Sequence, residues 1–168
     1  FLVAVLLAIP ALALSMISSI STWPPDTLGY LYLGLITVFI AYATVAVIRE
    51  VLLAERVTVH TISGAVVVYL LISLVWALLY IIAEGLHPES FSFTQANAMA
   101  SVEAPDLMAN LTYFSLITIT SAGYGDVTPI SDTARTLASL EAVLGQIFLA
   151  VLVAWLVGKY LSHSENRE

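Results

Sequence analysis

Residues 118–126 read Thr-Ile-Thr-Ser-Ala-Gly-Tyr-Gly-Asp, a hydroxyl-rich run that ends in two glycines separated by one tyrosine. Gly123 and Gly125 occupy alternate positions, and a backbone that points successive carbonyl oxygens to one side needs angles that a Cβ resists. The same spacing also occurs in turns and phosphate loops, so the alternative is a glycine-rich turn between two hydrophobic helices. The Thr-rich run before the glycines and Asp126 after them favour a specialised loop.

The composition is that of an integral membrane protein. Of the 168 residues, 60% are hydrophobic and only 10% are charged, and the mean hydropathy is +0.98. Soluble domains carry about 25% charged residues. The net charge of −7 argues against a nucleic-acid partner, and the absence of cysteine excludes disulfides and thiolate metal sites.

Four apolar runs are long enough to cross about 30 Å of hydrocarbon. Two of them, residues 1–20 and 28–48, predict a pair of transmembrane helices within an N-terminal region, 1–60, that ends in a charged connection. The other two runs, residues 61–83 and 133–161, predict a second pair of helices. The sequence therefore predicts an all-α membrane protein.

A polar loop, residues 84–104, and a short apolar run, residues 106–119, separate the last two spans. Pro105 and Asp106 suit the first turn of a helix, because proline fits there and an acid complements the positive end of the helix dipole. The run is too short to span, so it predicts a re-entrant helix. Non-helical backbone after such a helix is tolerated where it lines a cavity.

This arrangement resembles the pore of tetrameric potassium channels, whose usual filter sequence is TVGYG. The resemblance covers residues 61–168 as outer helix, pore helix, filter (121–126) and inner helix, and Tyr113-Phe114-Ser115 is similar to bacterial members. It implies a homotetramer in which backbone carbonyls and the Ser121 hydroxyl bind K⁺, while the Tyr124 ring packs outward against surrounding helices. The filter residues that it implies are Ser121, Ala122, Gly123, Tyr124 and Gly125.

The sequence departs from that family inside the filter. Ser121 replaces the usual Thr and Ala122 the usual Val, so the hydroxyl remains but two stiff β-branched side chains are lost, which should loosen the filter. Ile117 occupies a position where some relatives have a glutamate that bonds the Asp after the filter. Asp126 therefore needs another partner or stays in water. Thr120 and Asp126 are candidates for filter support.

Glu141 is an unexpected carboxylate within the apolar part of the last span. Three placements are open: bonded to a pore-helix Thr or Ser behind the filter, facing the cavity as a ring that attracts K⁺, or in external water at a helix end. The register of the resemblance directs Glu141 toward the pore helix, as filter support. Gly145, one turn further on, is either a gating hinge, as the resemblance implies, or a close-packing contact.

The basic residues predict the orientation. Arg49 and Arg56 lie between the second and third spans, Lys159 and Arg167 lie at or after the end of the fourth, and only Arg135 lies on the opposite side. The positive-inside rule then places both termini in the cytoplasm of a plasma or inner membrane. Acidic residues predicted outside would attract cations: Asp26, Glu84, Glu89, Glu103, Asp106, Asp126 and Asp132.

The sequence thus predicts one subunit of a K⁺-selective channel, a passive conductor with no catalysis, no cofactor, and K⁺ as its permeant ligand. A weakly selective cation channel of the same fold is one rival, favoured by Ser121 and Ala122. A subunit of a K⁺ uptake transporter and a structural membrane protein with a chance glycine turn are the others. No span carries Arg or Lys at every third position, so a conventional voltage sensor is not expected.

Overall fold

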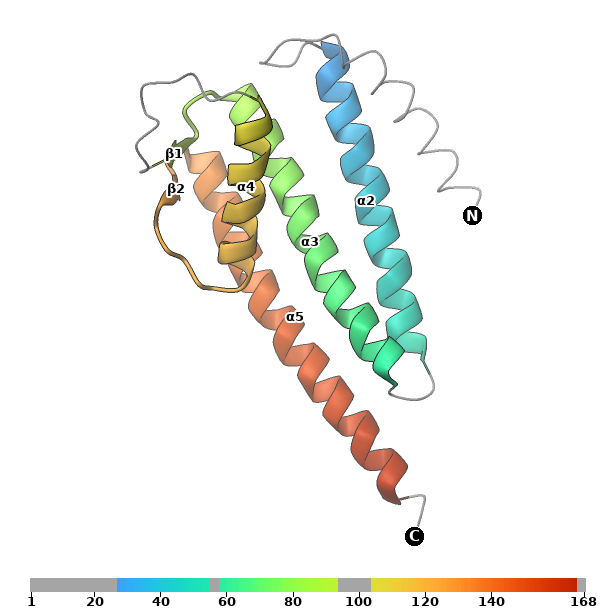
Figure 1. The fold of residues 1–168 in the computed structure, drawn as a ribbon. Helices are drawn as coiled ribbons and strands as arrows, with labels where there is room; N and C mark the ends of the chain where they lie inside the picture. The colour runs from blue at the N-terminus through green and yellow to red at the C-terminus, as the bar shows by residue number, and fades with distance from the viewer. Residues whose placement is uncertain (1–26, 55–57, 94–103, 166–168) are drawn as a thin grey trace.

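The computed structural model describes residues 27–54, 58–93 and 104–165 (Figure 1). Its elements in chain order are α2 (Thr27–Leu53), α3 (Val59–Leu86), β1 (Phe91–Phe93), α4 (Ala104–Ile119), β2 (Val127–Pro129) and α5 (Asp132–Glu165). Helices α2, α3 and α5 are long and apolar enough to cross a membrane, and they correspond to the second, third and fourth predicted spans. The predicted first span, residues 1–20, lies outside the described residues.

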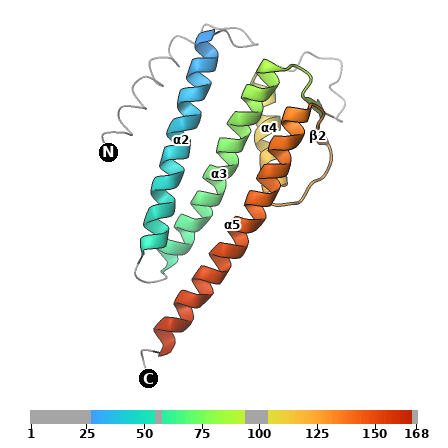
Figure 2. The same cartoon turned by 180° about the vertical axis from the view of Figure 1, so that it is seen from behind.

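The helices form an elongated bundle in which α3 lies beside α2 on one side and contacts α4 and α5 on the other (Figures 1 and 2). The short helix α4 starts at the end of the bundle that holds β1 and β2, and it runs only to the middle of the bundle (Figure 1). The chain then returns to the end from which α4 started, where α5 begins. The path from α4 to α5 is therefore re-entrant.

Side-chain caps fix where two of the long helices begin. Helix α3 opens with a capping box, in which the Thr61 N–H donates to the Thr58 hydroxyl oxygen and the Thr58 N–H donates to the Thr61 hydroxyl oxygen, both at 3.3 Å. Before α5, the Ser131 hydroxyl oxygen accepts the Ala134 N–H at 3.2 Å. Asp132 in the first turn of α5 complements the positive end of its dipole.

The packed core lies where α3, α4 and the two strands meet. Tyr80, Phe91 and Phe114 form a triangle of edge-to-face ring contacts, with ring centroids 5.1 to 5.4 Å apart. Leu111 from α4 and Ala134 from α5 are fully buried in the same cluster. This core holds the re-entrant helix firmly against the outer and inner helices.

The structure differs from the sequence-based expectation mainly in the loop 84–104. That loop was expected to lack regular structure, but it contains β1, which pairs antiparallel with β2 so that Phe91 lies opposite Pro129. Burial of the Phe91 ring in the aromatic triangle provides the reason for this pairing. Helix α2 extends into the charged connection as far as Leu53, because the residues from Arg49 to Leu53 are compatible with a helix.

Candidate functional site

The site begins where α4 ends. The Ala122 N–H donates to the Ile117 carbonyl oxygen at 2.8 Å, and the Ser121 N–H donates to the Thr118 carbonyl oxygen at 2.9 Å. These two bonds form the Schellman arrangement, which satisfies the last free carbonyls of a helix. The Gly123 N–H also donates to the Ile117 carbonyl oxygen, at 3.1 Å. Three successive N–H groups therefore point back toward the helix end.

The sign of the φ angle alternates along residues 121–125, which we call the filter segment. Ser121, Gly123 and Gly125 have positive φ angles of 58°, 49° and 78°. A Cβ added to Gly123 or Gly125 would meet no atom within 4 Å, so the backbone angle and not crowding calls for glycine at both positions. The positive φ of Ser121 is a departure that the sequence did not predict, and a left-handed conformation costs about 1–2 kcal/mol at a non-glycine residue.

The carbonyl oxygens of the filter segment accept no hydrogen bond from any described residue. All five residues of the segment are exposed in the single chain. Tyr124 is 74% exposed, so the described helices of this chain do not cover the ring, which the sequence predicts to pack against surrounding helices. The segment thus presents a series of free backbone oxygens that can coordinate a cation.

The Ser121 side chain has a partner on α5. Gln146 donates from Nε2 to the Ser121 hydroxyl oxygen at 2.7 Å. Sequence reasoning missed Gln146, although one signal was present: it is the single amide side chain between residues 132 and 165. Thr120, expected to support the filter, donates its hydroxyl to the Leu116 carbonyl oxygen at 2.6 Å, a bond within its own helical turn.

Asp126 finds its partner on α4. The Tyr113 hydroxyl donates to Asp126 Oδ2 at 2.7 Å, and the Val127 N–H donates to Asp126 Oδ1 at 3.1 Å. The hydrogen bond to Asp126 raises the pKa of Tyr113 to about 12, because the carboxylate favours the protonated phenol. Tyr113 thereby provides the hydrogen bond to Asp126 that Ile117 cannot, since Ile117 is apolar and buried.

Glu141 lies fully buried between three helices. It accepts hydrogen bonds from the Tyr80 hydroxyl of α3 and the Ser115 hydroxyl of α4. The Ser115 oxygen also lies 2.7 Å from the Ser73 carbonyl oxygen, so its single proton can serve either acceptor. Of the three placements that the sequence left open, the side chain takes the one that contacts the pore helix.

Gly145 lies at the closest approach of α5 to the end of α4. A Cβ on Gly145 would lie 2.5 Å from the Ile119 carbonyl oxygen and 2.7 Å from the Ile119 Cγ1. The same carbonyl oxygen accepts the Tyr69 hydroxyl at 2.7 Å. Helix α5 runs without interruption through this point. The structure therefore gives Gly145 the close-packing contact that was one of its two alternatives.

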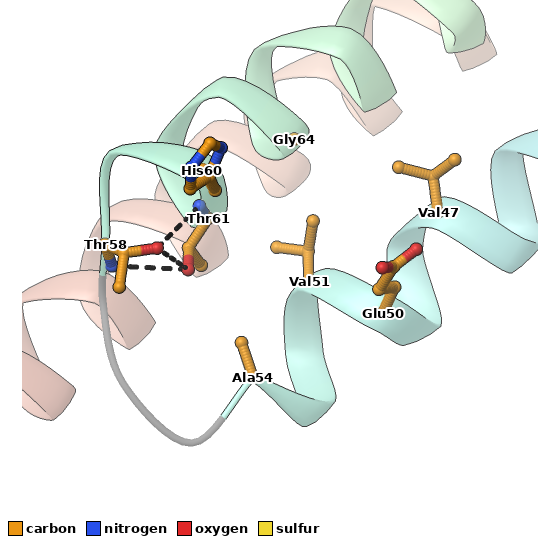
Figure 3. A pocket seen from close by; sticks show the side chains of 8 residues that line it. All are labelled: Val47, Glu50, Val51, Ala54, Thr58, His60, Thr61 and Gly64. Carbon is orange, nitrogen blue, oxygen red and sulfur yellow. Dashed lines mark hydrogen bonds between the residues drawn. The ribbon is translucent and has the colours of Figure 1, made fainter.

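A separate cavity of about 540 Å³ lies near the connection of α2 to α3 (Figure 3). Its lining includes Val47 and Glu50 from α2 and Thr58, His60 and Gly64 from the start of α3. It lies at the end of the hairpin opposite the filter segment. None of the residues that hold the filter segment takes part in it.

Comparison with known proteins gives a matching family model and several similar proteins. A family model described as "Ion channel" matches residues 57–162. Protein LctB of Geobacillus stearothermophilus is 32% identical over 129 residues, which are 75% of this chain and 92% of that protein. Protein LctB of Bacillus caldotenax is 32% identical over 127 residues, with the same shares. Two-pore potassium channel 4 of Arabidopsis thaliana is 28% identical over 116 residues, 67% of this chain.

The family match contains α3, α4, the filter segment and nearly all of α5, the elements that build the site. The chain spans 38% of the length of the plant protein, so that similarity concerns only part of it. No solved structure matches the chain.

Proposed function

Because this chain belongs to the ion channel family, we propose that it is one subunit of a potassium-selective channel that conducts K⁺ passively through the filter segment. One observation carries the proposal. The segment turns the N–H groups of its first three residues toward α4, has positive φ at alternate residues, and leaves its carbonyl oxygens without hydrogen bonds from the described residues. Such oxygens can replace the hydration shell of a permeating cation.

A homotetramer is part of the proposal. One chain supplies one filter segment, and oxygens on one side of an ion cannot replace a whole hydration shell. Four copies around an axis would close rings of carbonyl oxygens. The 74% exposure of Tyr124 in the single chain supports this assembly, because the described helices leave the ring uncovered and a neighbouring subunit can offer it an apolar surface.

The proposed orientation has the filter segment near the outer face and the connection of α2 to α3 in the cytoplasm. Arg49 lies near the end of α2. Lys159 of α5 donates to the Ala54 carbonyl oxygen, so two of the basic residues gather at the end of the bundle away from the filter segment. A cytoplasmic location for that end follows from the positive-inside rule, and a plasma or inner membrane is the proposed location.

Selectivity for K⁺ is supported by the Gly-Tyr-Gly sequence and by the similarity to a protein named as a potassium channel. A weakly selective cation channel is the second candidate, favoured by Ser121 and Ala122. Ser121 keeps the hydroxyl, but neither residue has the branched side chain that stiffens χ1. The ratio of K⁺ to Na⁺ permeability separates the two functions.

The test is ion flux through the purified protein in liposomes, under K⁺ or Na⁺ gradients, with single-channel recording in planar bilayers over a range of voltages. We expect K⁺ flux to exceed Na⁺ flux greatly, and Gly123→Ala to abolish it because a Cβ disfavours the positive φ at that position. Gly34→Ala is the matched control, since a Cβ there meets no atom within 4 Å. Equal fluxes would favour the weakly selective channel, and no conductance at any voltage would contradict both.

A further inference from the structure

Gln146 joins the inner helix α5 to the first residue of the filter segment. Its Nε2 lies 2.7 Å from the Ser121 hydroxyl oxygen, and the two residues are 25 positions apart in the chain. Both side chains are exposed in the single chain, on a surface that a second subunit or the pore would face. This hydrogen bond is a direct side-chain contact between α5 and the filter segment.

Ser121 needs such a partner for two physical reasons. Its φ of 58° is unfavourable for a residue with a Cβ, and such conformations persist only when surrounding contacts fix them. Serine also lacks the methyl group that restricts χ1 in threonine, so its hydroxyl can rotate among three wells. The two main-chain bonds at the end of α4 fix the backbone here but leave the hydroxyl free to turn.

The position of Gln146 is itself fixed by its neighbour. Gly145 lets α5 approach the Ile119 carbonyl oxygen to a distance that a Cβ would not allow. This close approach carries the next side chain of the helix, Gln146, into reach of Ser121. A serine oxygen has two lone pairs, so it can accept the amide N–H with one and coordinate a cation with the other.

We propose that Gln146 is a positioning residue for the innermost cation site of the filter segment. Its amide holds the Ser121 hydroxyl oxygen in the rotamer that faces the ion, which replaces the restriction that a β-branched residue would provide. Selectivity at this site then depends on the position of α5. This inference rests on the proposed channel function and assigns to α5 a part in ion discrimination.

The test compares Gln146→Met with the unchanged protein by reversal potentials in mixed K⁺ and Na⁺. Methionine keeps the length and the unbranched chain but removes the amide donor. We expect the ratio of K⁺ to Na⁺ permeability to fall about threefold to tenfold, the effect of losing one hydrogen bond of ordinary strength. Tetramer yield and melting temperature should stay unchanged, because Gln146 is exposed and buries no core surface.

A second variant tests whether Gln146 acts through Ser121. In Ser121→Thr, the added methyl restricts χ1 without help, so Gln146→Met in that background should leave the permeability ratio unchanged. Ser139→Ala is the matched control: Ser139 is an exposed polar residue of α5 whose hydroxyl donates to the Arg135 carbonyl oxygen of its own helix at 2.8 Å. It should leave the ratio unchanged.

Two results would overturn the inference. The permeability ratio of Gln146→Met could equal that of the unchanged protein, or it could fall equally in both backgrounds, which would assign the effect to the polarity of the surroundings. In both cases, selective K⁺ flux through the unchanged protein would leave the proposed function intact. An unchanged protein that does not distinguish K⁺ from Na⁺ would instead contradict the proposed function, and the inference with it.

Discussion

At the scale of single residues, the residues that follow α4 combine unusual backbone angles with polar side-chain contacts. Ser121 has the backbone angle of a glycine, and Asp126 closes the filter segment with one carboxylate oxygen bonded to a main-chain N–H and the other to Tyr113. Each of these residues is held by a partner that lies elsewhere in the chain. The side chains that fix the two ends of the segment, Gln146 and Tyr113, come from different helices, α5 and α4.

Replacement of Tyr113 by Phe tests whether the bond to Asp126 holds the outer end of the filter segment in place. The variant removes the donor to Asp126 Oδ2, so we expect K⁺ current to decay about twofold to tenfold faster during sustained conduction, because one carboxylate oxygen loses its anchor. Tyr113→Trp keeps a ring N–H and should decay more slowly than Tyr113→Phe. Equal decay in all three proteins would show that this bond does not hold the filter segment.

The hydrogen bond between Tyr113 and Asp126 should stabilise the fold only over a defined pH range. An unfolded tyrosine ionises near pH 10, and Asp126 raises the pKa of Tyr113 to about 12 in the folded chain. The bond therefore contributes its full stability below pH 10 and loses that contribution as the pH rises to 12. Ultraviolet titration of phenolate should show a late-ionising tyrosine that is absent from Tyr113→Phe. A titration identical in the two proteins would contradict the assignment.

At the scale of the elements, the re-entrant helix α4 is fastened on two sides. Glu141 of α5 and Ser73 of α3 can each accept a hydrogen bond from Ser115, one turn before the end of α4. Tyr69 of α3 and Gly145 of α5 contact Ile119 at its end. The outer and inner helices therefore contact the same short helix at two levels. Movement of either long helix must shift α4 or break these contacts.

Sequence reasoning predicted the described helices but not the contacts between them. Long apolar runs, the proline and acid in the first turn of α4, and the alternate glycines are local signals, and the described helices lie close to where those signals indicate. The strand β1 has three residues, too few to show a period. The partners of Glu141 lie 61 and 26 positions away, and only the packing of three helices brings them together.

Loss of the Glu141 carboxylate should destabilise the junction. In Glu141→Leu, the Tyr80 hydroxyl loses its acceptor inside the core, whereas Ser115 still has the Ser73 carbonyl oxygen. A buried hydroxyl without an acceptor should lower the free energy of unfolding by about 1–3 kcal/mol. Denaturation in detergent measures it. Tyr80→Phe combined with Glu141→Leu should be more stable than Glu141→Leu alone, and the reverse order would refute this account.

Gly145→Ala tests close packing against the hinge that the family resemblance implies. The new Cβ would meet the Ile119 carbonyl oxygen, and overpacking of this kind costs about 1–3 kcal/mol of folding stability. Gly34→Ala, with open space around its Cβ, should instead stabilise the protein by up to about 1 kcal/mol. If Gly145 serves only as a hinge, its Ala variant should melt no lower than Gly34→Ala and alter only opening and closing.

At the scale of the whole molecule, a single chain leaves the site incomplete. The filter segment is exposed, and apolar side chains of α5 such as Leu140, Val143 and Ile147 are about half exposed, at 50%, 56% and 53%. Helix α2 lies on the far side of α3, away from the filter segment (Figure 2). Lipid can cover α2, but free carbonyl oxygens in hydrocarbon need polar partners, which other subunits and ions can supply.

Binding of K⁺ between subunits should therefore stabilise the assembly itself. In the proposed homotetramer, an ion coordinated by four chains binds the assembly and not the separated subunits, so K⁺ at 100 times its dissociation constant should add about 2.7 kcal/mol per site. We expect thermal dissociation, followed by size-exclusion chromatography, to occur at a higher temperature in K⁺ than in Na⁺ of equal ionic strength. Gly123→Ala should remove the difference because it disturbs the carbonyl geometry, while Gly34→Ala should keep it. Identical dissociation of the unchanged protein in the two salts would mean that these oxygens do not distinguish K⁺ from Na⁺, however they are arranged in one subunit.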